Sequence, residues 1–215
     1  MRIAKQGYPF IVGSAAAGLV ALLLAKSLGN VALGMLSGVL FLLAAFCAYF
    51  FRDPSRIIPR GDHLILSPAD GKVMEIVEGK DPAFDQPVWI MRIFLSVFDP
   101  HIQRMPVGGK VEAMTYTKGK FLDARDPKAC FENEQNRVEI NSPRGRIVVT
   151  QIAGLIARRI VWWVREGQSL AAGEQFGLIR FGSQVDVVLP KTVQFRVKAG
   201  DRVEAGSSVI AEAAR

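Results

Sequence analysis

The residues most able to do chemistry in this sequence are a serine near the C-terminus and one of its two histidines. Ser183 follows Gly182 and begins an apolar, β-like run that ends at Pro190. A free serine hydroxyl is a weak nucleophile at neutral pH and needs a neighbouring base. We interpret Gly182-Ser183 as a candidate self-cleavage site at which Ser183 becomes a covalently built prosthetic group. The same residue pair occurs at positions 13–14 and 206–207, so the rest of the sequence must support this interpretation.

The two histidines lie in different surroundings. His101 comes just past the apolar run Val88–Phe98, and loops that follow strands commonly carry binding and catalytic residues. A loop histidine without any such role is the ordinary alternative. His63 follows Gly61-Asp62 in a polar turn, which is typical of a surface residue. Two distant histidines and Cys130 make a poor ligand set, so we expect no metal site.

Two internal repeats predict how these residues are positioned. The segment Pro68–Val73 resembles Pro106–Val111. A valine, a glycine and a second glycine six residues later also occur twice, at Val164, Gly167 and Gly173 and again at Val197, Gly200 and Gly206. This second pattern resembles the hammerhead turns of biotinyl and lipoyl domains. We therefore predict a mainly β fold, a barrel-sandwich built from related halves.

Asp70 stands out within the first repeat. The copy has Gly108 at the matching position, so the geometry of the turn does not itself require a carboxylate. A polar turn residue in the sequence Pro-Ala-Asp-Gly is the ordinary alternative. Asp70 is therefore a candidate functional residue only in the company of the other motifs.

Apolar runs bounded by Gly and Pro predict the strands of this domain. Val88–Phe98 is typical of a buried strand, and further strands are expected at Arg137–Ile140, Arg146–Ile152 and Ile160–Val164. No long amphipathic helix is indicated there. Residues 118–136 are polar and irregular, and we expect a mobile loop over a site.

The N-terminal part predicts a membrane-spanning helical hairpin. Residues 8–25 and 27–51 carry no charge. As helices, Tyr8–Ala25 and Val31–Phe51 would be ~27 Å and ~31 Å long, close to the ~30 Å of a hydrocarbon core. A cleaved signal peptide is disfavoured because the second segment is too long for an h-region. A buried hairpin of a soluble protein is also disfavoured at this length. We therefore divide the chain into a membrane hairpin, residues 1–51, and a second domain, residues 52–215.

Charge predicts the orientation and the partners. Basic residues lie before and after the hairpin, whereas its connecting turn has only Lys26, so both ends are expected in the cytoplasm and the hairpin in the inner membrane. The net charge of the chain is +7, and the smaller basic excess past Phe51, 24 Lys and Arg against 20 Asp and Glu, suits a domain held against anionic headgroups. No basic stripe with interleaved aromatics indicates nucleic-acid binding. Cys47 and Cys130 are not expected to pair, which fits a reducing compartment.

Six motifs in a fixed order carry a resemblance to a known family. They are similar to the short, membrane-anchored branch of the phosphatidylserine decarboxylase proenzymes, which includes archaeal archaetidylserine relatives. The resemblance covers nearly the whole chain from Phe51 onward. No single motif is decisive, but the ordered set is specific: residues 51–54, 67–73, 96–101, 118–121, 132–134 and 181–183.

The resemblance implies a pyruvoyl cofactor made from Ser183. The Ser183 hydroxyl would attack the Gly182 carbonyl, elimination would release a chain ending at Gly182, and hydrolysis would leave pyruvoyl at the start of the fragment 183–215. Removal of carbon dioxide from an amino acid needs an electron sink, which a cofactor usually supplies. The substrate would form a Schiff base with the pyruvoyl carbonyl, and phosphatidylserine would become phosphatidylethanolamine. The expected partners are the membrane phospholipid and the cleaved small chain, with homo-oligomerisation left open.

The resemblance also implies roles for individual residues. His101 would be the base for cleavage and the acid that reprotonates the product, with Asp70 orienting it as a carboxylate does in a serine triad. Longer family members carry a second histidine three residues on, where this chain has Arg104. Arg104 is therefore a candidate ligand of the lipid phosphate, as are Arg158 and Arg159.

Other functions remain open from the sequence alone. A membrane-tethered, lipoyl-like adaptor would share the hairpin and the β repeats, but Lys72-Val73-Met74 does not match a carrier lysine turn. A membrane serine hydrolase would need a nucleophile elbow, and no Gly-x-Ser-x-Gly occurs. An ether-linked archaetidylserine is the alternative substrate within the decarboxylase hypothesis.

Overall fold

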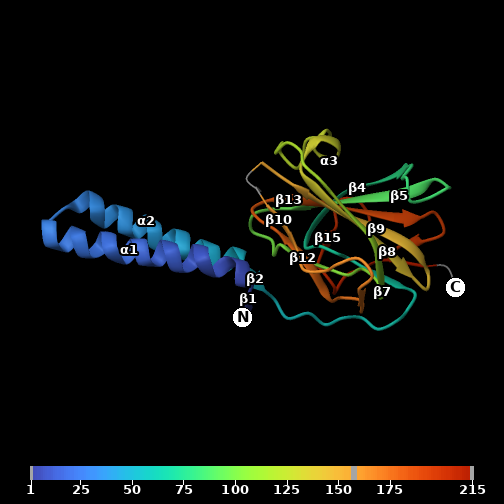
Figure 1. Cartoon of the computed structure of the whole chain (residues 1–215), viewed down its shortest axis with the longest axis horizontal. Coiled ribbons are helices and arrows are strands. Elements are labelled where there is room, and N and C mark those ends of the chain that lie inside the picture. Colours follow the sequence, from blue (N-terminus) through green and yellow to red (C-terminus); the bar gives the residue numbers. More distant parts are fainter. Residues whose placement is uncertain (1, 156–158, 214–215) are drawn as a thin grey trace. The chain divides into compact units, whose positions relative to one another are not determined.

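The computed structural model describes residues 2–155 and 159–213, and the chain divides into two units between Ser55 and Arg56. The first unit contains two long helices, α1 (Tyr8–Leu28) and α2 (Val31–Phe50), seen in Figure 1. Gly29 ends α1 in a left-handed conformation, and the Asn30 side chain caps α2 by accepting the Leu33 N–H. These two residues make the tight turn of the hairpin.

The ends and the middle of the hairpin are fixed by a few polar contacts. A short helix, η1 (Lys5–Gly7), precedes α1, and β1 (Arg2–Ile3) pairs with β2 (Arg52–Asp53) at the base. Between the helices, the Ser37 hydroxyl donates a 2.8 Å hydrogen bond to the Gly18 carbonyl. Gly18 has no side chain, which lets the helices approach each other closely.

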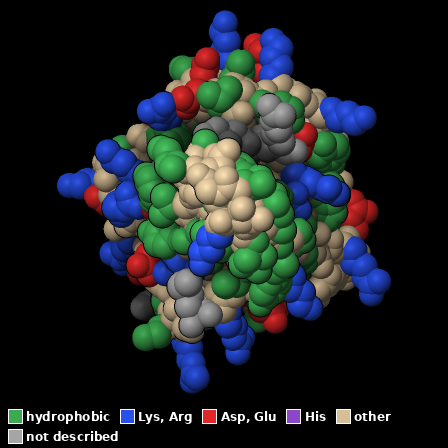
Figure 2. Space-filling view, turned by 90° about the vertical axis from the view of Figure 1, so that its left-hand side faces the viewer, with side chains coloured by type: hydrophobic (Ala, Val, Ile, Leu, Met, Phe, Trp, Pro, Cys, Tyr) green, Lys and Arg blue, Asp and Glu red, His purple; other side chains and the backbone are tan. Residues whose placement is uncertain are grey.

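The two helices are long and apolar enough to cross a membrane, with mean hydropathies of 2.0 and 2.4. Most of their large side chains are exposed, including Leu28, Val31, Met35 and Leu42. Hydrophobic side chains are extensive on the face shown in Figure 2. Exposed apolar surface of this extent suggests membrane association.

The second unit is a β-sandwich of three antiparallel sheets within the described residues. The large sheet has the order β11-β7-β8-β9-β13-β5-β4-β15, and the small sheets are β10-β12-β6 and β14-β16-β3 (Figure 1). The elements are β3 (Leu64–Leu66), β4 (Gly71–Gly79), β5 (Val88–Leu95), β6 (Ile102–Arg104), β7 (Gly109–Thr117), α3 (Ala129–Glu132), β8 (Gln135–Ser142), β9 (Gly145–Ala153), β10 (Ile160–Trp162), β11 (Ser169–Leu170), β12 (Gln175–Ile179), β13 (Ser183–Pro190), β14 (Gln194–Phe195), β15 (Arg202–Val203) and β16 (Val209–Glu212).

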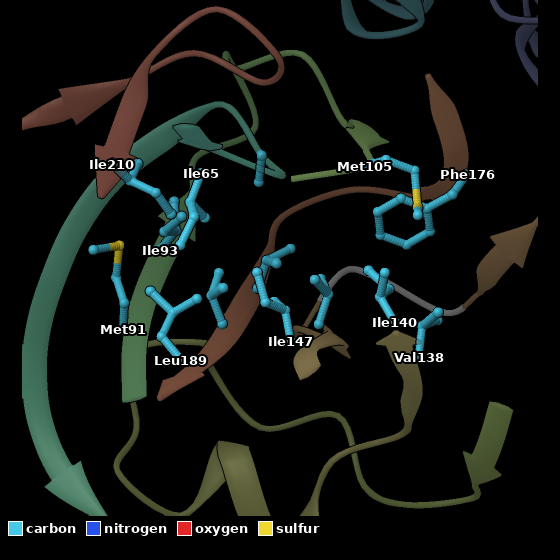
Figure 3. Close-up of a cluster of buried hydrophobic side chains, with 14 of the residues drawn as sticks. Ile65, Met91, Ile93, Met105, Val138, Ile140, Ile147, Phe176, Leu189 and Ile210 are labelled. Atoms are coloured by element: carbon cyan, nitrogen blue, oxygen red, sulfur yellow. The ribbon is translucent and has the colours of Figure 1, made fainter. Parts of the chain in front are cut away.

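The hydrophobic core lies between the large sheet and the two small ones. Alternate residues of the long strands point inward, and each buried aliphatic side chain stabilises the fold by about 1.5–3 kcal/mol. Figure 3 shows side chains from all three sheets meeting there: Ile65, Met91, Ile93, Met105, Val138, Ile140, Ile147, Phe176, Leu189 and Ile210. The prediction of a mainly β sandwich that follows an apolar helix pair is confirmed, and the sheets do not close into a barrel.

The sandwich consists of two similar halves. In one half Gly200 N–H donates to the Val73 carbonyl, and in the other Gly167 N–H donates to the Val111 carbonyl, both at 2.8 Å. β15 pairs with the start of β4 as β11 pairs with the start of β7. In the large sheet, β11, β7, β8 and β9 of one half therefore correspond to β15, β4, β5 and β13 of the other. The two halves meet where β9 pairs with β13.

Two predicted segments differ from the structure. The run Val88–Phe98 leaves the sheet after Leu95, because the Asp99 carboxylate accepts the Ser96 N–H and turns the chain. Residues 118–136 are not irregular throughout, since they contain α3 and enter β8 at Gln135. The Asn133 side chain holds this segment by donating to the carbonyls of Leu122 and Ala153 and accepting the Leu122 N–H.

Candidate active site

Ser183 is the first residue of β13, at the centre of the large sheet. It pairs with Leu95 of β5 on one side and with Ala153 of β9 on the other. Its side chain is fully buried, and its hydroxyl has no hydrogen-bond partner among the described residues. A buried polar group without a partner is costly to a fold, so this hydroxyl indicates a functional position.

The two halves of the sandwich diverge at this position. In the second half, Ser142 and Gly145 face each other across a tight turn that joins β8 to β9. Their counterparts in the first half are Leu95 and Ser183, which also face each other but are not joined by a turn. The chain leaves β5 after Leu95 and enters β13 only at Ser183, after forming the strands of the other half. The site therefore lies at the ends of two paired strands, β5 and β13, whose counterparts in the other half are joined by a hairpin turn.

The backbone just before Ser183 is strained. Phe181 has a φ of 60°, the one positive value at a described residue other than glycine, and Gly182 has a φ of 72°. A bulky residue in this region costs on the order of 1–3 kcal/mol, whereas glycine tolerates it. Strain of this kind is typical of functional sites, and here it sits beside the Gly182–Ser183 peptide bond.

The Gly182 carbonyl packs directly against Gly154. A Cβ atom added to Gly154 would lie 2.6 Å from the carbonyl oxygen of Gly182 and 3.2 Å from its carbon. No side chain can occupy that position without moving one of the two backbones. Gly154 thus permits the orientation of the carbonyl that precedes Ser183, a role that the sequence did not reveal.

His101 lies on the loop that connects β5 to β6. Its ring is fully buried, with Nδ1 2.7 Å from the Asp99 carbonyl oxygen and Nε2 accepting the Gly182 N–H at 3.0 Å. A carbonyl can only accept, so Nδ1 carries the proton and Nε2 the lone pair. The structure therefore brings His101 to the Gly182–Ser183 pair with its basic nitrogen facing it.

Asp99 fixes the conformation of this loop, and its place in a family motif was the one sequence signal that could have identified it. Its carboxylate accepts the Ser96 N–H at 2.9 Å and forms an ion pair with Arg202, while its carbonyl binds the His101 ring. A comparison of the repeats over a longer stretch would have related the two histidines, because His63 precedes Pro68 as His101 precedes Pro106. His63 immediately precedes β3, the corresponding strand of the other half, but is partly exposed.

Asp70 is buried beside Arg56, with which it forms an ion pair. Burial raises the pKa of the Asp70 carboxyl to about 6, although the Arg56 charge opposes this and the Ala205 backbone also donates to the carboxylate. The contacts described for Asp70 are thus with Arg56 and Ala205. Its action on His101 stays a prediction.

Of the three arginines predicted to bind substrate, the structure describes Arg104 and Arg159. Arg104 donates to the Gly173 carbonyl at 3.1 Å. Arg159 lines a separate cavity of about 530 Å³ with Tyr116, Glu134 and Trp162. Arg158 lies outside the described residues.

A cavity of about 450 Å³ opens beside Gly182. Its described lining is mostly apolar and includes neither Arg104 nor Arg159. The lining residues are Phe94, Leu95, Ser96, Val97, Phe98, Asp123, Ala124, Arg125, Gly154, Leu155, Phe181 and Gly182. A buried serine hydroxyl, a histidine with its basic nitrogen at the preceding residue and an adjoining apolar cavity could together support chemistry on an amphipathic substrate.

Comparison with known proteins agrees with this arrangement. The family model described as phosphatidylserine decarboxylase matches residues 43–211. The chain is also 44% identical, over 209 residues, to the phosphatidylserine decarboxylase proenzyme of Geotalea uraniireducens (strain Rf4), covering 97% of this chain and 95% of that protein. The chain therefore belongs to the phosphatidylserine decarboxylase family.

Proposed function

We propose that this protein converts phosphatidylserine to phosphatidylethanolamine with a pyruvoyl group that it makes by cleaving itself between Gly182 and Ser183. Membership of a decarboxylase family supports the reaction. The single observation that carries the self-cleavage is the buried, unpartnered Ser183 hydroxyl, which follows a strained backbone and a glycine bonded to His101.

The cleavage follows from the groups present. His101 Nε2 takes the proton of the Ser183 hydroxyl, whose oxygen then attacks the Gly182 carbonyl carbon. The proton passes from His101 to the Ser183 nitrogen as the amide bond breaks, which leaves an ester between Gly182 and Ser183 and a free Ser183 amine. Loss of the Ser183 Cα proton expels the Gly182 carboxylate and leaves a dehydroalanine, which water converts to pyruvoyl with release of ammonia. Cleavage makes Gly182 a free chain end, so the backbone of Phe181 can leave its strained conformation.

The residues that remain fit such a group. Ser183 is held between β5 and β9, so a carbonyl at this position would stay buried next to the apolar cavity. The pyruvoyl carbonyl would supply the electron sink for loss of carbon dioxide. His101, held by the Asp99 carbonyl, is positioned to return a proton to the product.

The helical hairpin gives this activity a location. We propose that it spans the inner membrane with the sandwich in the cytoplasm, since basic residues flank both of its ends. The substrate is then a lipid of the same bilayer, and the fragment 183–215 is the partner of the fragment 1–182.

The test is the mass of the chains in the purified protein. The proposal expects two fragments, 1–182 and 183–215, the shorter one lacking a serine amino terminus, together with release of carbon dioxide from phosphatidylserine. Ser183→Ala should leave one chain. Ser207→Ala is the matched control, because Ser207 also follows a left-handed glycine, Gly206, and this variant should still cleave. An intact wild-type chain that still releases carbon dioxide would refute the proposal. Release from an ether-linked serine phospholipid alone would identify archaetidylserine as the substrate.

A further inference from the structure

The cavity beside Gly182 has the features of a slot for a phospholipid headgroup. It is formed by four segments that are far apart in the sequence: the end of β5 with its following turn, the 123–125 turn, residues 154–155 and residues 181–182. Its walls are mostly apolar, and among its described lining residues the charged side chains are Asp123 and Arg125. The slot thus combines an apolar lining with one cation.

The mouth of the cavity carries large apolar side chains that face solvent. Phe98 and Leu155 are each 63% exposed and both line the cavity. Exposed apolar residues at the rim of a site mark a surface that contacts another apolar phase. The basic side chain of Arg125 at this cavity suits an anionic headgroup, so lipid is the favoured occupant.

Arg125 is held over this slot by weak contacts. Its Nε and Nη2 donate to the two carboxylate oxygens of Asp123 at 2.9 and 2.6 Å, and its guanidinium lies 5.9 Å from the Phe94 ring centroid. The Arg125 side chain is 69% exposed, and exposed ion pairs contribute little to stability. A guanidinium has five N–H donors, and Nη1 takes no part in the Asp123 pair, so a phosphate can bind while the pair persists or replace it.

We infer that Arg125 binds the phosphodiester of the substrate phospholipid in this cavity, with Phe98 and Leu155 in contact with the lipid at its mouth. This inference rests on the proposed function and assigns its substrate subsite. It replaces Arg104 and Arg159 as phosphate ligands, because Arg104 is bonded to the Gly173 carbonyl and Arg159 lines another cavity. Sequence reasoning missed Arg125 because it lies in the polar segment 118–136, away from the motif arginines.

The first experiment compares Arg125→Gln and Arg125→Lys with the wild type, using full-length protein and phosphatidylserine in detergent micelles. Loss of a charge-assisted contact to phosphate should raise KM about tenfold in Arg125→Gln with kcat within about threefold, and Arg125→Lys should recover part of the loss. In Arg125→Gln, inhibition by phosphatidylmethanol, an anionic phosphodiester without an amine, should weaken by the same factor as KM rises. Inhibition by uncharged diacylglycerol should not change. Arg144→Gln is the matched control, because Arg144 also forms a surface pair, with Asp62, but does not line the cavity.

The outcomes separate this inference from the proposed function. Complete self-cleavage of Arg125→Gln would show that the variant folds. A wild type that releases no carbon dioxide from phosphatidylserine would overturn the proposed function and this inference with it. An active wild type with an unchanged KM in Arg125→Gln, or equal weakening of both inhibitors, would overturn the inference alone.

A second experiment tests the mouth of the cavity. Phe98→Ser should raise KM for long-chain phosphatidylserine several-fold and leave KM for a water-soluble, short-chain phosphatidylserine unchanged. Phe131→Ser is the control, because Phe131 is also an exposed phenylalanine but does not line the cavity. Equal effects of Phe98→Ser and Phe131→Ser, or none for Phe98→Ser, would contradict contact with lipid at this rim.

Discussion

The backbone N–H of Gly182 donates a 3.0 Å hydrogen bond to Nε2 of His101. This contact joins the residue before the proposed cleavage site to the nitrogen that we propose as acceptor of the Ser183 proton. The Asp99 carbonyl fixes the opposite side of the ring and hence its tautomer. In the proposed self-cleavage, Nε2 would exchange its hydrogen bond from the Gly182 N–H for one from the Ser183 hydroxyl before it takes the proton.

His101→Ala should slow self-cleavage by about 10²–10⁴-fold, the usual contribution of a general base. His63→Ala is the control, since His63 holds the corresponding position in the other half of the sandwich and is partly exposed. That variant should cleave at the wild-type rate. The rates can be followed by denaturing electrophoresis after cell-free synthesis. Equal rates for His101→Ala and wild type would exclude His101 as the base.

Gly154→Ala should slow self-cleavage by tenfold or more and destabilise the uncleaved chain by roughly 1–3 kcal/mol. The added Cβ would meet the Gly182 carbonyl oxygen at 2.6 Å, and neither backbone can yield without distorting β9 or the segment before β13. Gly108→Ala is the matched control, because its Cβ would find its nearest neighbour at an ordinary 3.6 Å. The same electrophoretic assay gives the rates, and thermal unfolding gives the stability. Similar behaviour of the two variants would show that the site tolerates a side chain at Gly154.

The architecture could be predicted because it depends on repeated local signals. Gly167 and Gly200 mark two equivalent turns, in which their N–H groups donate to the carbonyls of Val111 and Val73. The repeat in the sequence thus corresponds to a repeat in the structure. The apolar run at 183–190 had the length and composition of a buried strand and forms one. The hairpin likewise follows from uninterrupted apolar residues around Gly29-Asn30.

The details of the site could not be predicted because they depend on contacts between distant backbones. The partner of His101 Nδ1 is a carbonyl, a group that every residue has. The need for glycine at 154 arises only when β9 and β13 bring it against Gly182. The hydrogen bond from Arg104 to the Gly173 carbonyl likewise depends on how β6 pairs with β12, and phosphate binding by Arg104 stays an untested prediction.

The two fragments should stay assembled after cleavage. The fragment 183–215 contributes β13 to the centre of the large sheet, β15 to its edge, and β14 and β16 to a small sheet. β13 is hydrogen-bonded to β5 and β9 and buries Val185, Val187 and Leu189. The fragments should therefore co-elute in detergent and separate only in denaturant, as read by mass spectrometry of the eluted peak. Loss of the small fragment under native conditions would contradict this arrangement.

Asp186 should make the stability of the sandwich depend on pH. It lies on β13, beside Arg92 and Gln184, and burial raises the pKa of its carboxyl from 3.8 to about 6, against the opposing effects of Gln184 and Arg92. The folded chain therefore holds this proton more tightly than the unfolded chain. The resulting stabilisation is complete below pH 3.8 and is lost as the pH rises through about 6. Its full size is roughly 3 kcal/mol at most.

Replacement of Asp186 by Asn should remove this dependence. In the uncleaved Ser183→Ala background, the melting temperature of Asp186→Asn relative to its parent should rise between pH 4 and pH 7, measured by tryptophan fluorescence in detergent. Asp62→Asn is the control with the opposite sign, because the Arg144 hydrogen bond lowers the pKa of the exposed Asp62 carboxyl. Removal of that group should cost more stability as the pH rises. A constant difference between Asp186→Asn and its parent across this range would mean that Asp186 ionises alike in the folded and unfolded chains, and that the charge of Arg92 fully offsets its burial.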